Sequence, residues 1–380
     1  MLDAKALTED QIASVTGSKY AGGKFNLAMF SDGLTEERER GITIDVAYRY
    51  FSTPTHKFIL ADCPGHAEYT RNMVTGASNS DIALILVDAS TAVIAGELEP
   101  QTNLHYRICT TFGIKPIFVV NKADAIGWEP KLLEEIRLVV EKLANGKHHG
   151  IINISALSGE NVSTQRTPGV PCLMDQILKV ATNDTLQTLP GCIVLRKSCE
   201  DNKFIGDVVS GAFNTSDKVV AAHPNYSKAS DAILASLSRL GVETDQVIAG
   251  DAIEVTLTGV NPGPCDELVL MHSPIEYLPT TNKIFATLIC MSPEPLKANL
   301  QIQTTSSVTD CISVQTIAKL NTENGKYSLC DAAVEPNDIW RVEILLQRPI
   351  ITSSVLHHPL NNFILINSRT GSTVAAGLVR

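Results

Sequence analysis

The sequence of 380 residues lacks any apolar run long enough to cross a membrane and has no apolar core near its N-terminus. A membrane-spanning helix needs about 20 predominantly apolar residues in a row, and a secretory leader needs a shorter apolar stretch behind a basic start. The opening residues, MLDAKALTED, provide neither. We therefore expect a protein with no membrane role and no secretion signal.

Paired cysteine motifs are also missing, although the chain contains nine cysteines. They are spread along the sequence without a C-x-x-C pair, which argues against a zinc site and against a disulfide framework. Unpaired cysteines suit a reducing compartment. The sequence therefore predicts a cytoplasmic location.

Basic stretches are scarce, and the formal net charge is −10. The densest run of charge, residues 36–40 (EERER), mixes both signs. A protein that grips RNA or DNA needs a basic face, because contacts to phosphate supply much of the affinity. The composition therefore predicts that the chain has no nucleic-acid partner.

What the chain does contain is a polar turn at the end of an apolar run, Asp62–His66 (DCPGH) after Lys57–Ala61 (KFILA). The apolar run predicts a buried parallel strand. In α/β nucleotide-binding sheets, an Asp at the carboxyl end of such a strand is linked to Mg²⁺. Gly65 has no Cβ, so its amide can approach a γ-phosphate, and His66 then lies beside the attacking water. Alone, D-x-x-G also fits an ordinary strand-to-loop turn.

A second apolar strand, Lys115–Val120, ends in the tetrapeptide NKAD. The carboxylate of Asp124 can accept hydrogen bonds from both N1–H and the 2-amino group of guanine. Asn121 fixes the loop, and the stem of Lys122 covers the base. Adenine lacks the 2-amino donor, so this pair of acceptors discriminates against it.

A third strand, Ile151–Ile154, ends in Ser155, Ala156 and Leu157, where a backbone N–H can donate to O6 of guanine. Each of the three motifs is weak alone. Their order, each at the carboxyl end of a strand, predicts a guanine-nucleotide-binding domain.

Thr43 opens an alternating strand, Ile44–Phe51, after a charged segment that ends at Gly41. The pattern fits a surface helix followed by an edge strand. It also fits a switch segment in which the Thr43 hydroxyl is a ligand of Mg²⁺ and its amide contacts the γ-phosphate. Such a segment orders with the triphosphate and loosens after hydrolysis.

The domain organisation changes near residue 188. Before it, strand patterns alternate with helical ones such as Pro130–Gly146, which predicts a mostly parallel sheet covered by helices. After it, helical periodicity is scarce and short β-rich runs lie between Gly, Asn and Pro turns. We therefore predict an α/β domain at residues 1–187 and β-barrels at 188–278 and 279–380.

The combination resembles translational GTPases, and among them the GTPase subunit of bacterial sulfate adenylyltransferase (ATP sulfurylase). The DCPGH and NKAD motifs are shared with elongation factor Tu and elongation factor 1-alpha. The stretches 37–53 (ERERGITIDVAYRYFST), 69–78 (YTRNMVTGAS) and 370–378 (TGSTVAAGL) are typical of the sulfurylase subunit. The resemblance runs along the whole chain.

That resemblance implies a G domain followed by two β-barrels, GTP and Mg²⁺ as cofactors, and a small catalytic subunit as partner. The partner makes adenylyl sulfate and pyrophosphate from ATP and sulfate, and GTP hydrolysis drives this unfavourable step. The resemblance places Thr43 and Asp62 at Mg²⁺ and makes His66 the catalytic residue that positions water. The implied nucleotide-binding residues are Asp62, Cys63, Pro64, Gly65, His66, Asn121, Lys122, Asp124, Ser155, Ala156 and Leu157.

The sequence departs from this family at its start, because it contains no Walker A motif, G-x-x-x-x-G-K-[ST]. The nearest stretch, Ser18–Phe25 (SKYAGGKF), lacks the first Gly and the Ser/Thr after Lys, and we interpret it as a linker. A Walker A loop cradles the phosphates with its amides and its lysine. The expected fold is therefore a P-loop-type α/β G domain, N-terminally truncated, followed by two β-barrels.

Three hypotheses stay open. In the first, the start of the chain is misplaced or shortened, and the natural protein is a working GTPase. In the second, the Walker A loop has been lost, and the chain survives as a nucleotide-independent scaffold or decaying copy. The third hypothesis, an elongation factor that delivers aminoacyl-tRNA, is opposed by the negative charge and by the phrase DVAYRYF at residues 45–51. Whether this chain hydrolyses GTP is thus left undecided.

Overall fold

The computed structural model describes residues 37, 42–181, 186–200, 202–222, 229–259, 268–272, 280–293, 296, 299–330, 332–353 and 358–380. The chain divides into two compact units. Unit 1 comprises Met1–Thr182 and Asn321–Lys326, and unit 2 comprises Asn183–Leu320 and Tyr327–Arg380. The stretch Ser18–Phe25, which we interpret as a linker, lies outside the described residues.

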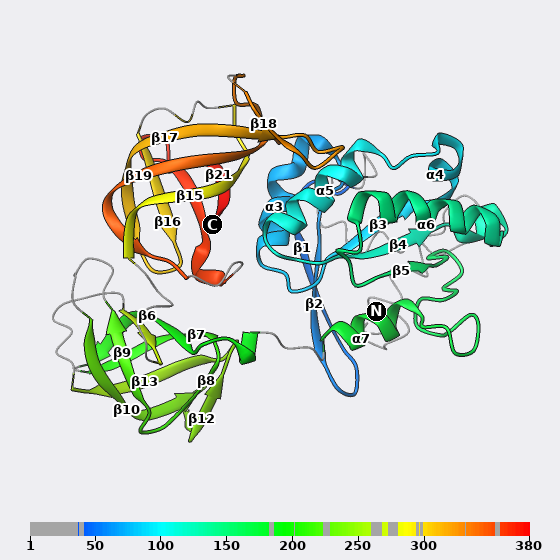
Figure 1. The fold of residues 1–380 in the computed structure, drawn as a ribbon. Coiled ribbons are helices and arrows are strands. Elements are labelled where there is room, and N and C mark those ends of the chain that lie inside the picture. Colours follow the sequence, from blue (N-terminus) through cyan, green and yellow to red (C-terminus); the bar gives the residue numbers. More distant parts are fainter. Residues whose placement is uncertain are drawn as a thin grey trace. The chain divides into compact units, whose positions relative to one another are not determined.

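Strands and helices alternate in unit 1 (Figure 1), as the sequence predicts. Their order is β1 (Ala47–Ser52), β2 (Lys57–Asp62), the 3-10 helix η2 (Ala67–Tyr69), α3 (Thr70–Ser78), β3 (Leu84–Asp88), α4 (Ala89–Ala95), α5 (Pro100–Thr111), β4 (Ile117–Asn121), the 3-10 helix η3 (Ala123–Ile126), α6 (Pro130–Ala144), β5 (Gly150–Asn153) and α7 (Leu173–Ala181).

The three strands β3, β4 and β5 form a parallel sheet in that order. Ile117 and Val119 of β4 pack on one face against apolar side chains of α7. Phe118 points to the other face, where its ring lies 5.8 Å from that of Tyr106 on α5, and the Tyr106 hydroxyl donates to the carbonyl of Ala144 at the end of α6. Successive residues of a strand point to opposite faces, so β4 is buried on both sides. Figure 1 shows α5 and α7 on different sides of these strands.

The prediction of a buried parallel strand at Lys57–Ala61 is wrong. β2 pairs antiparallel with β1, with Ala47 opposite Asp62. Its side chains are largely exposed, and Ile59 is 66% exposed. In the described residues β2 has a strand partner only in β1, so its apolar composition does not lead to burial in the parallel sheet.

Helix α6 confirms the predicted amphipathic helix and its ends. Pro130 occupies the first turn, where its missing N–H costs nothing. The helix stops at Ala144, and Asn145 follows in the left-handed conformation with φ 47°. Asn tolerates this region better than most residues, so it closes the helix one position before Gly146.

Unit 2 consists of strands joined by short connections. The first set is β6 (Cys192–Glu200), β7 (Lys203–Ser210), β8 (Ala212–Asn214), β9 (Lys218–Ala222), β10 (Ser230–Arg239), β11 (Val242–Glu243), β12 (Gln246–Ile248), β13 (Ala252–Thr258) and β14 (Leu268–Met271). The second set is β15 (Thr280–Cys290), β16 (Leu300–Thr304), β17 (Val308–Leu320), β18 (Tyr327–Leu329), β19 (Ile339–Ile351), β20 (Asn362–Asn367) and β21 (Thr373–Val379). Short 3-10 helices lie at Leu186–Thr188 (η4) and Pro359–Asn361 (η6).

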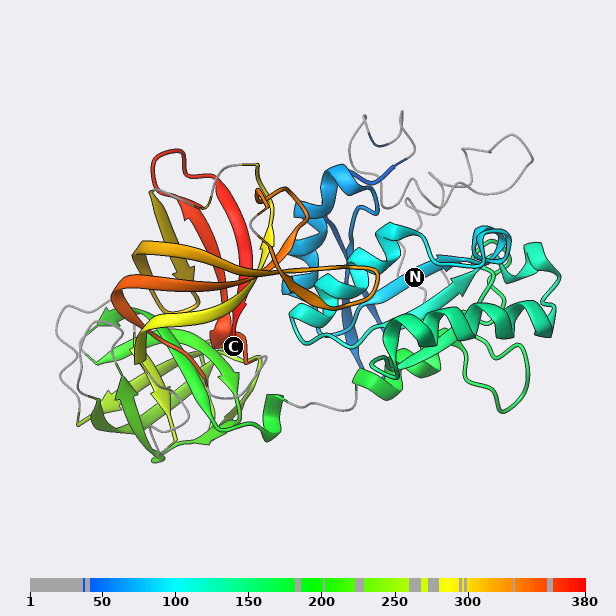
Figure 2. The ribbon, with the colours of Figure 1, turned by 45° about the horizontal axis from the view of Figure 1, so that its top comes forward.

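Each set closes into a barrel. The first sheet runs β11-β10-β13-β7-β6-β14-β9, and the pairing of β9 with β10 closes it. The second runs β16-β20-β21-β15-β19-β17-β18, and the pairing of β16 with β17 closes it. Figure 2 shows the strands of the second barrel, yellow to red, curling around a common centre. Closure into a barrel removes the unpaired edges of a sheet. The two barrels, together with the α/β domain before them, confirm the predicted fold class.

Unit 2 also contains a buried imidazole between elements of the two barrels. The Oγ of Ser210 donates to the carbonyl of Pro190 (2.6 Å) and lies 3.0 Å from Nε2 of His358. The amide of Leu360 donates to Nδ1 of the same ring (3.2 Å). Nε2 therefore carries the proton in this network. Burial lowers the pKa of His358 to about 4, so the ring is neutral at pH 7.

Within the described ranges, no helix combines the length and the apolar character that a membrane crossing requires. The predicted domain boundaries at 187/188 and 278/279 stay predictions.

Candidate functional site

The loops that follow β4 and β5 are tied together by one side chain. The Oδ1 of Asn121 accepts from the amide of Lys122 (2.8 Å) and from the amide of Ala156 (2.9 Å). The amide of Ala123, a fully buried residue, donates to the carbonyl of Ile154 (3.1 Å). The carboxyl ends of neighbouring parallel strands meet at one edge of a sheet, and these bonds hold their loops side by side there.

Backbone conformation presents the polar residues of the first loop outward. Lys122 has φ 61°, in the left-handed region, which turns the chain sharply between Asn121 and the buried Ala123. Asp124 lies in η3 and is exposed. A ligand can therefore reach the carboxylate that the sequence predicts to recognise guanine.

The second loop presents fewer amides than the sequence suggests. Ser155 is fully buried, its amide donates to the carbonyl of Glu160 (3.1 Å), and the amide of Ala156 is used by Asn121. Leu157 is 68% exposed. Among the three predicted amides, that of Leu157 is therefore the candidate donor for O6 of guanine.

Asp88, which is not among the site residues predicted from the sequence, lies beside this edge. Its Oδ2 is 2.5 Å from Nζ of Lys122, and its Oδ1 accepts from the amide of Ser90 (2.9 Å) at the start of α4. Burial alone would raise the pKa of Asp88, but the hydrogen bonds from Lys122 and Ser90 outweigh it and lower that pKa to about 2. The signal was present in the sequence, because Asp88 ends an apolar strand just as Asp62 does.

The predicted phosphate-side residues lie on the two-stranded sheet and the turn after it. Asp62 ends β2, Pro64 is buried, and Gly65 and His66 are exposed. The Nδ1 of His66 lies 4.0 Å from a carboxylate oxygen of Glu68. The imidazole is therefore on the surface of the turn, where it can reach a ligand.

Cys63 faces inward from this turn. Burial, and secondarily the charge of Asp62, raises the pKa of its thiol to about 11. A Cβ on Gly76 of α3 would overlap its Sγ. Cys63 therefore acts in packing the turn against α3, and its thiol is not a nucleophile at neutral pH.

Thr43 is half-buried in a loop before β1 that other residues hold in place. A carboxylate oxygen of Glu37 accepts from the amides of Ile44 (2.9 Å) and Asp45 (3.2 Å), and the side chain of Asn72 donates to the carbonyl of Ile44 (2.7 Å). Sequence patterns do not predict these contacts, because they join residues 7 to 28 positions apart. Gly41, where the charged segment was expected to end, lies outside the described residues.

No cluster of three or more His, Cys, Asp or Glu side chains able to hold a metal occurs in the described part of the chain. Mg²⁺ is commonly held by one or two protein oxygens together with phosphates and waters, so it does not need such a cluster. Thr43 offers a hydroxyl oxygen and Asp62 a carboxylate oxygen, and Mg²⁺ prefers oxygen ligands of this kind.

Comparison with known proteins agrees with this geometry. The family described as the elongation factor Tu GTP binding domain matches residues 4–186. The solved S. cerevisiae Ski7 GTPase-like domain, bound to GTP, covers 100% of this chain and 92% of its own at 16% identity and a TM-score of 0.51, which shows a shared fold.

Curated relatives are closer in sequence. Sulfate adenylyltransferase subunit 1 of Francisella tularensis subsp. tularensis (strain SCHU S4) is 32% identical over 400 residues, covering 99% of this chain and 82% of the relative. The same subunit of Alteromonas mediterranea is 34% identical over 402 residues, with the same two coverages, 99% and 82%. A G-type domain followed by two β-barrels, and this similarity along almost the whole chain, place the protein in the sulfate adenylyltransferase subunit 1 family.

Proposed function

We propose that the chain is the GTP-binding subunit of a sulfate adenylyltransferase, which couples GTP hydrolysis to the formation of adenylyl sulfate from ATP and sulfate. The observation that carries the proposal is the pair of hydrogen bonds that the amides of Lys122 and Ala156 donate to Oδ1 of Asn121. These bonds bring together the loops 121–128 and 155–160, which we call the first and second guanine loops. The family relationship supplies the other substrates of the proposal, ATP and sulfate.

In this proposal the guanine base lies between the two loops. The exposed Asp124 accepts from N1–H and the 2-amino group, and the amide of Leu157 donates to O6. The stem of Lys122 covers the base, while its ammonium group stays near Asp88. Adenine offers neither the 2-amino donor nor the O6 acceptor.

On the phosphate side, Thr43 and Asp62 would hold Mg²⁺, directly or through water. The bound ion would supply charge neutralisation for the β- and γ-phosphates. The amide of Gly65 would contact the γ-phosphate, and His66 would orient the attacking water. The open space around Gly65, where a Cβ would meet no atom within 4 Å, leaves room for this approach.

In this proposal the adenylylation itself belongs to a small catalytic partner subunit. The relatives are named "subunit 1", which implies a second subunit. The chain would act with that subunit in the cytoplasm. A formal net charge of −10 argues against RNA as a partner.

The test is titration of the chain with a fluorescent GTP analogue in the presence of Mg²⁺, with GDP and ADP as competitors. We expect displacement by GDP and not by ADP, and loss of this preference in Asp124→Asn, where one acceptor becomes a donor. His66→Ala should leave binding nearly intact while GTP turnover falls at least about a hundredfold, the scale of a lost general acid–base or water-positioning group.

Absence of guanine-specific binding would contradict the GTP-binding proposal. If the chain then still co-purified with the small sulfurylase subunit, the nucleotide-independent scaffold hypothesis would replace it. Binding of charged tRNA in a filter assay would favour the elongation-factor hypothesis instead.

A further inference from the structure

Trp128 is the last residue of the first guanine loop, and its own backbone conformation is unfavourable for an aromatic residue. Its amide donates to the carbonyl of Ala123 (2.8 Å), so the segment 123–128 is bridged by its own backbone. Its φ is 55°, in the left-handed region that bulky side chains rarely adopt. Such a conformation persists only where surrounding contacts hold it.

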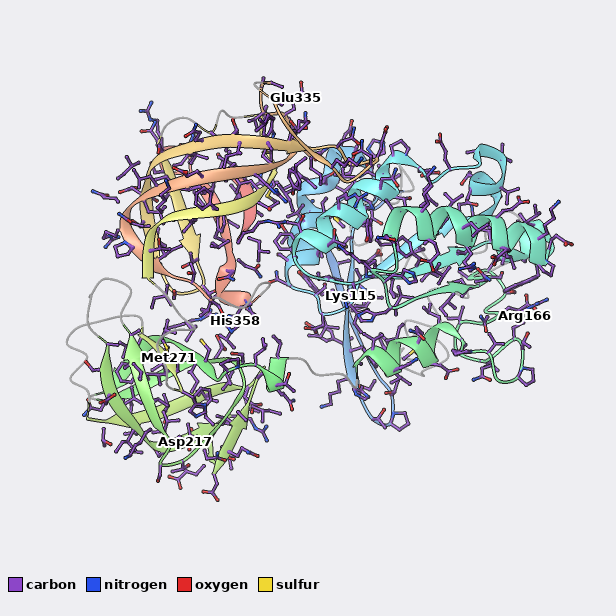
Figure 3. The ribbon with its side chains drawn as sticks, viewed as in Figure 1. Lys115, Arg166, Asp217, Met271, Glu335 and His358 are labelled. Carbon is purple, nitrogen blue, oxygen red and sulfur yellow. The ribbon has the colours of Figure 1, made fainter. Side chains whose placement is uncertain are left out.

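Two side chains of the connection between β5 and α7, Glu160 and Arg166, provide those contacts. The indole Nε1 of Trp128 donates to Oε2 of Glu160 (3.2 Å). The guanidinium carbon of Arg166 lies 4.1 Å from the centre of the indole ring, and its Nε is 3.9 Å from Oε1 of Glu160. Figure 3 shows Arg166 on the connection between β5 and α7. We call the three side chains the indole clasp.

The strength of the clasp lies in its indole contacts. The side chains of Arg166 and Glu160 are 42% and 47% exposed, so their ion pair is screened by water and contributes little. A hydrogen bond to a carboxylate is stronger than one between neutral groups. Trp is the aromatic side chain that forms the strongest cation–π contacts, and the guanidinium of Arg166 lies over its ring.

The position of Glu160 links the clasp to the guanine site. Its carbonyl accepts from the amide of Ser155, and the two residues form an isolated β-bridge that closes the second loop. Asn121 therefore joins the two loops at their near ends, through Ala156, while Trp128 joins them at their far ends, through Glu160.

We propose that the indole clasp is a positioning device that holds the loops 121–128 and 155–160 at a fixed spacing. This inference rests on the proposed function for its consequence, which is base selectivity. In the proposed complex, Asp124 accepts from N1–H and the 2-amino group, and the amide of Leu157 donates to O6, which is next to N1 on the same edge of guanine. The two contacts can therefore form together only if the loops keep their distance. Opening the clasp lets the second loop move away and weakens both contacts.

The test uses the full chain and begins without nucleotide. Trp128→Phe keeps a ring for Arg166 and removes the N–H donor, and Glu160→Ala removes the acceptor. We expect hydrogen–deuterium exchange in residues 155–160 to become about tenfold faster in both variants, the scale of a lost hydrogen bond to a charged group. Glu160→Gln keeps an acceptor oxygen without the charge, and its exchange should fall between those of the wild type and Glu160→Ala.

A matched control is Arg137→Ala, which removes a bidentate pair with Glu134 (2.7 Å for both bonds) on the surface of α6, in the same unit. It should not change exchange in residues 155–160. Unchanged exchange in Trp128→Phe and Glu160→Ala would overturn the clasp. So would acceleration of the same size in the Arg137 control.

The second measurement is the ratio of Kd values for inosine diphosphate and GDP, which differ by the 2-amino group that Asp124 recognises. We expect Trp128→Phe to lower this ratio about fivefold or more, because a loosened pair of loops discriminates less. A ratio equal to that of the wild type, despite faster exchange, would overturn the positioning role. If the wild type binds no guanine nucleotide, the proposed function fails, and the exchange measurement still decides whether the clasp joins the loops.

Discussion

The carboxamide oxygen of Asn121 lies 2.9 Å from the amide nitrogen of Ala156, which is 35 residues further along the chain. The same oxygen accepts from the amide of Lys122 at 2.8 Å. A single acceptor with two lone pairs thus satisfies one donor from each loop. This arrangement makes the position of one loop depend directly on the position of the other.

Replacing Asn121 by Ala should therefore affect both loops at once. Two amides lose their acceptor, and we expect guanine-nucleotide affinity to fall about tenfold or more, since an unmet donor costs roughly 1–3 kcal/mol. Isothermal titration with GDP measures this. Asn121→Asp keeps the acceptor oxygen in place and should retain most of the affinity, so an equal loss in both variants would contradict the role of the oxygen.

The sequence predicted this region well because its signals are local. An apolar run followed at once by NKAD marks the end of β4, and the structure ends that strand at Asn121. The same logic located β5 and the residues after it. Helix α6 was predicted almost to the residue, because Pro130 marks its beginning and the apolar period marks its buried face.

The predictions that failed or were missed concern contacts between residues far apart in the sequence, which composition does not encode. Lys57–Ala61 is as apolar as a buried parallel strand, yet β2 pairs antiparallel with β1, and none of its residues is fully buried. The contacts of Asp88 with Lys122, and of Trp128 with Glu160, join residues more than thirty positions apart. Such pairs depend on how loops are placed in space, and a single sequence does not reveal that.

Gly76 provides a test of packing behind the Asp62–His66 turn. A Cβ at this position would overlap Sγ of Cys63. Ala favours a helix over Gly by about 1 kcal/mol, but overpacking a buried site costs about 1–3 kcal/mol. We expect Gly76→Ala to lower the free energy of unfolding of unit 1, as measured by denaturant titration of Trp128 fluorescence in a Trp340→Phe background, which removes the signal of unit 2.

Two further variants control for this effect. Gly65→Ala introduces a methyl group where nothing lies within 4 Å, and its stability should be unchanged. In a Cys63→Ala background the substitution Gly76→Ala should cost less than in the wild type. Equal costs in both backgrounds would show that Sγ is not the obstacle.

Asp88 should contribute to stability against acid. Its pKa is lowered to about 2 from an ordinary value of 3.8. As the pH falls, Asp88 is therefore protonated in the unfolded chain before it is protonated in the folded chain. The contribution is complete above about pH 4 and is lost as the pH falls toward 2. Because the side chain is partly exposed, we expect no more than about 1 kcal/mol from its pairing with Lys122.

The variant Asp88→Asn distinguishes the contribution of the charge of Asp88 from its contribution as the N-cap of α4. Asn keeps an oxygen for the amide of Ser90, so α4 retains its N-cap, but the attraction for Lys122 is gone. The acid-unfolding curve of unit 1, followed by circular dichroism, should be flatter between pH 4 and 2 than that of the wild type. Asp88→Ala should cost about 1 kcal/mol more because it also removes the cap, and equal stability of the two variants would contradict this division.

His358 should make unit 2 less stable as the pH falls below neutrality. Burial lowers its pKa to about 4 from an ordinary value of 6.5, so between these values the unfolded chain binds a proton that the folded chain does not. The free energy of unfolding then decreases with falling pH, by roughly 3 kcal/mol in total for a buried group. Protonation of Nδ1 would also break the bond from the amide of Leu360.

His358→Asn removes the titration while its Oδ1 can still accept from the amide of Leu360. Denaturant unfolding at pH 7 and pH 5, followed by the fluorescence of the buried Trp340 in a Trp128→Phe background, compares the two chains in unit 2 alone. The wild type should lose more stability than the variant between these pH values, because each pH unit in this window costs about 1.4 kcal/mol per histidine. The same loss in both chains would mean that another group of unit 2 carries the pH dependence, and that burial does not keep His358 neutral in this pH range.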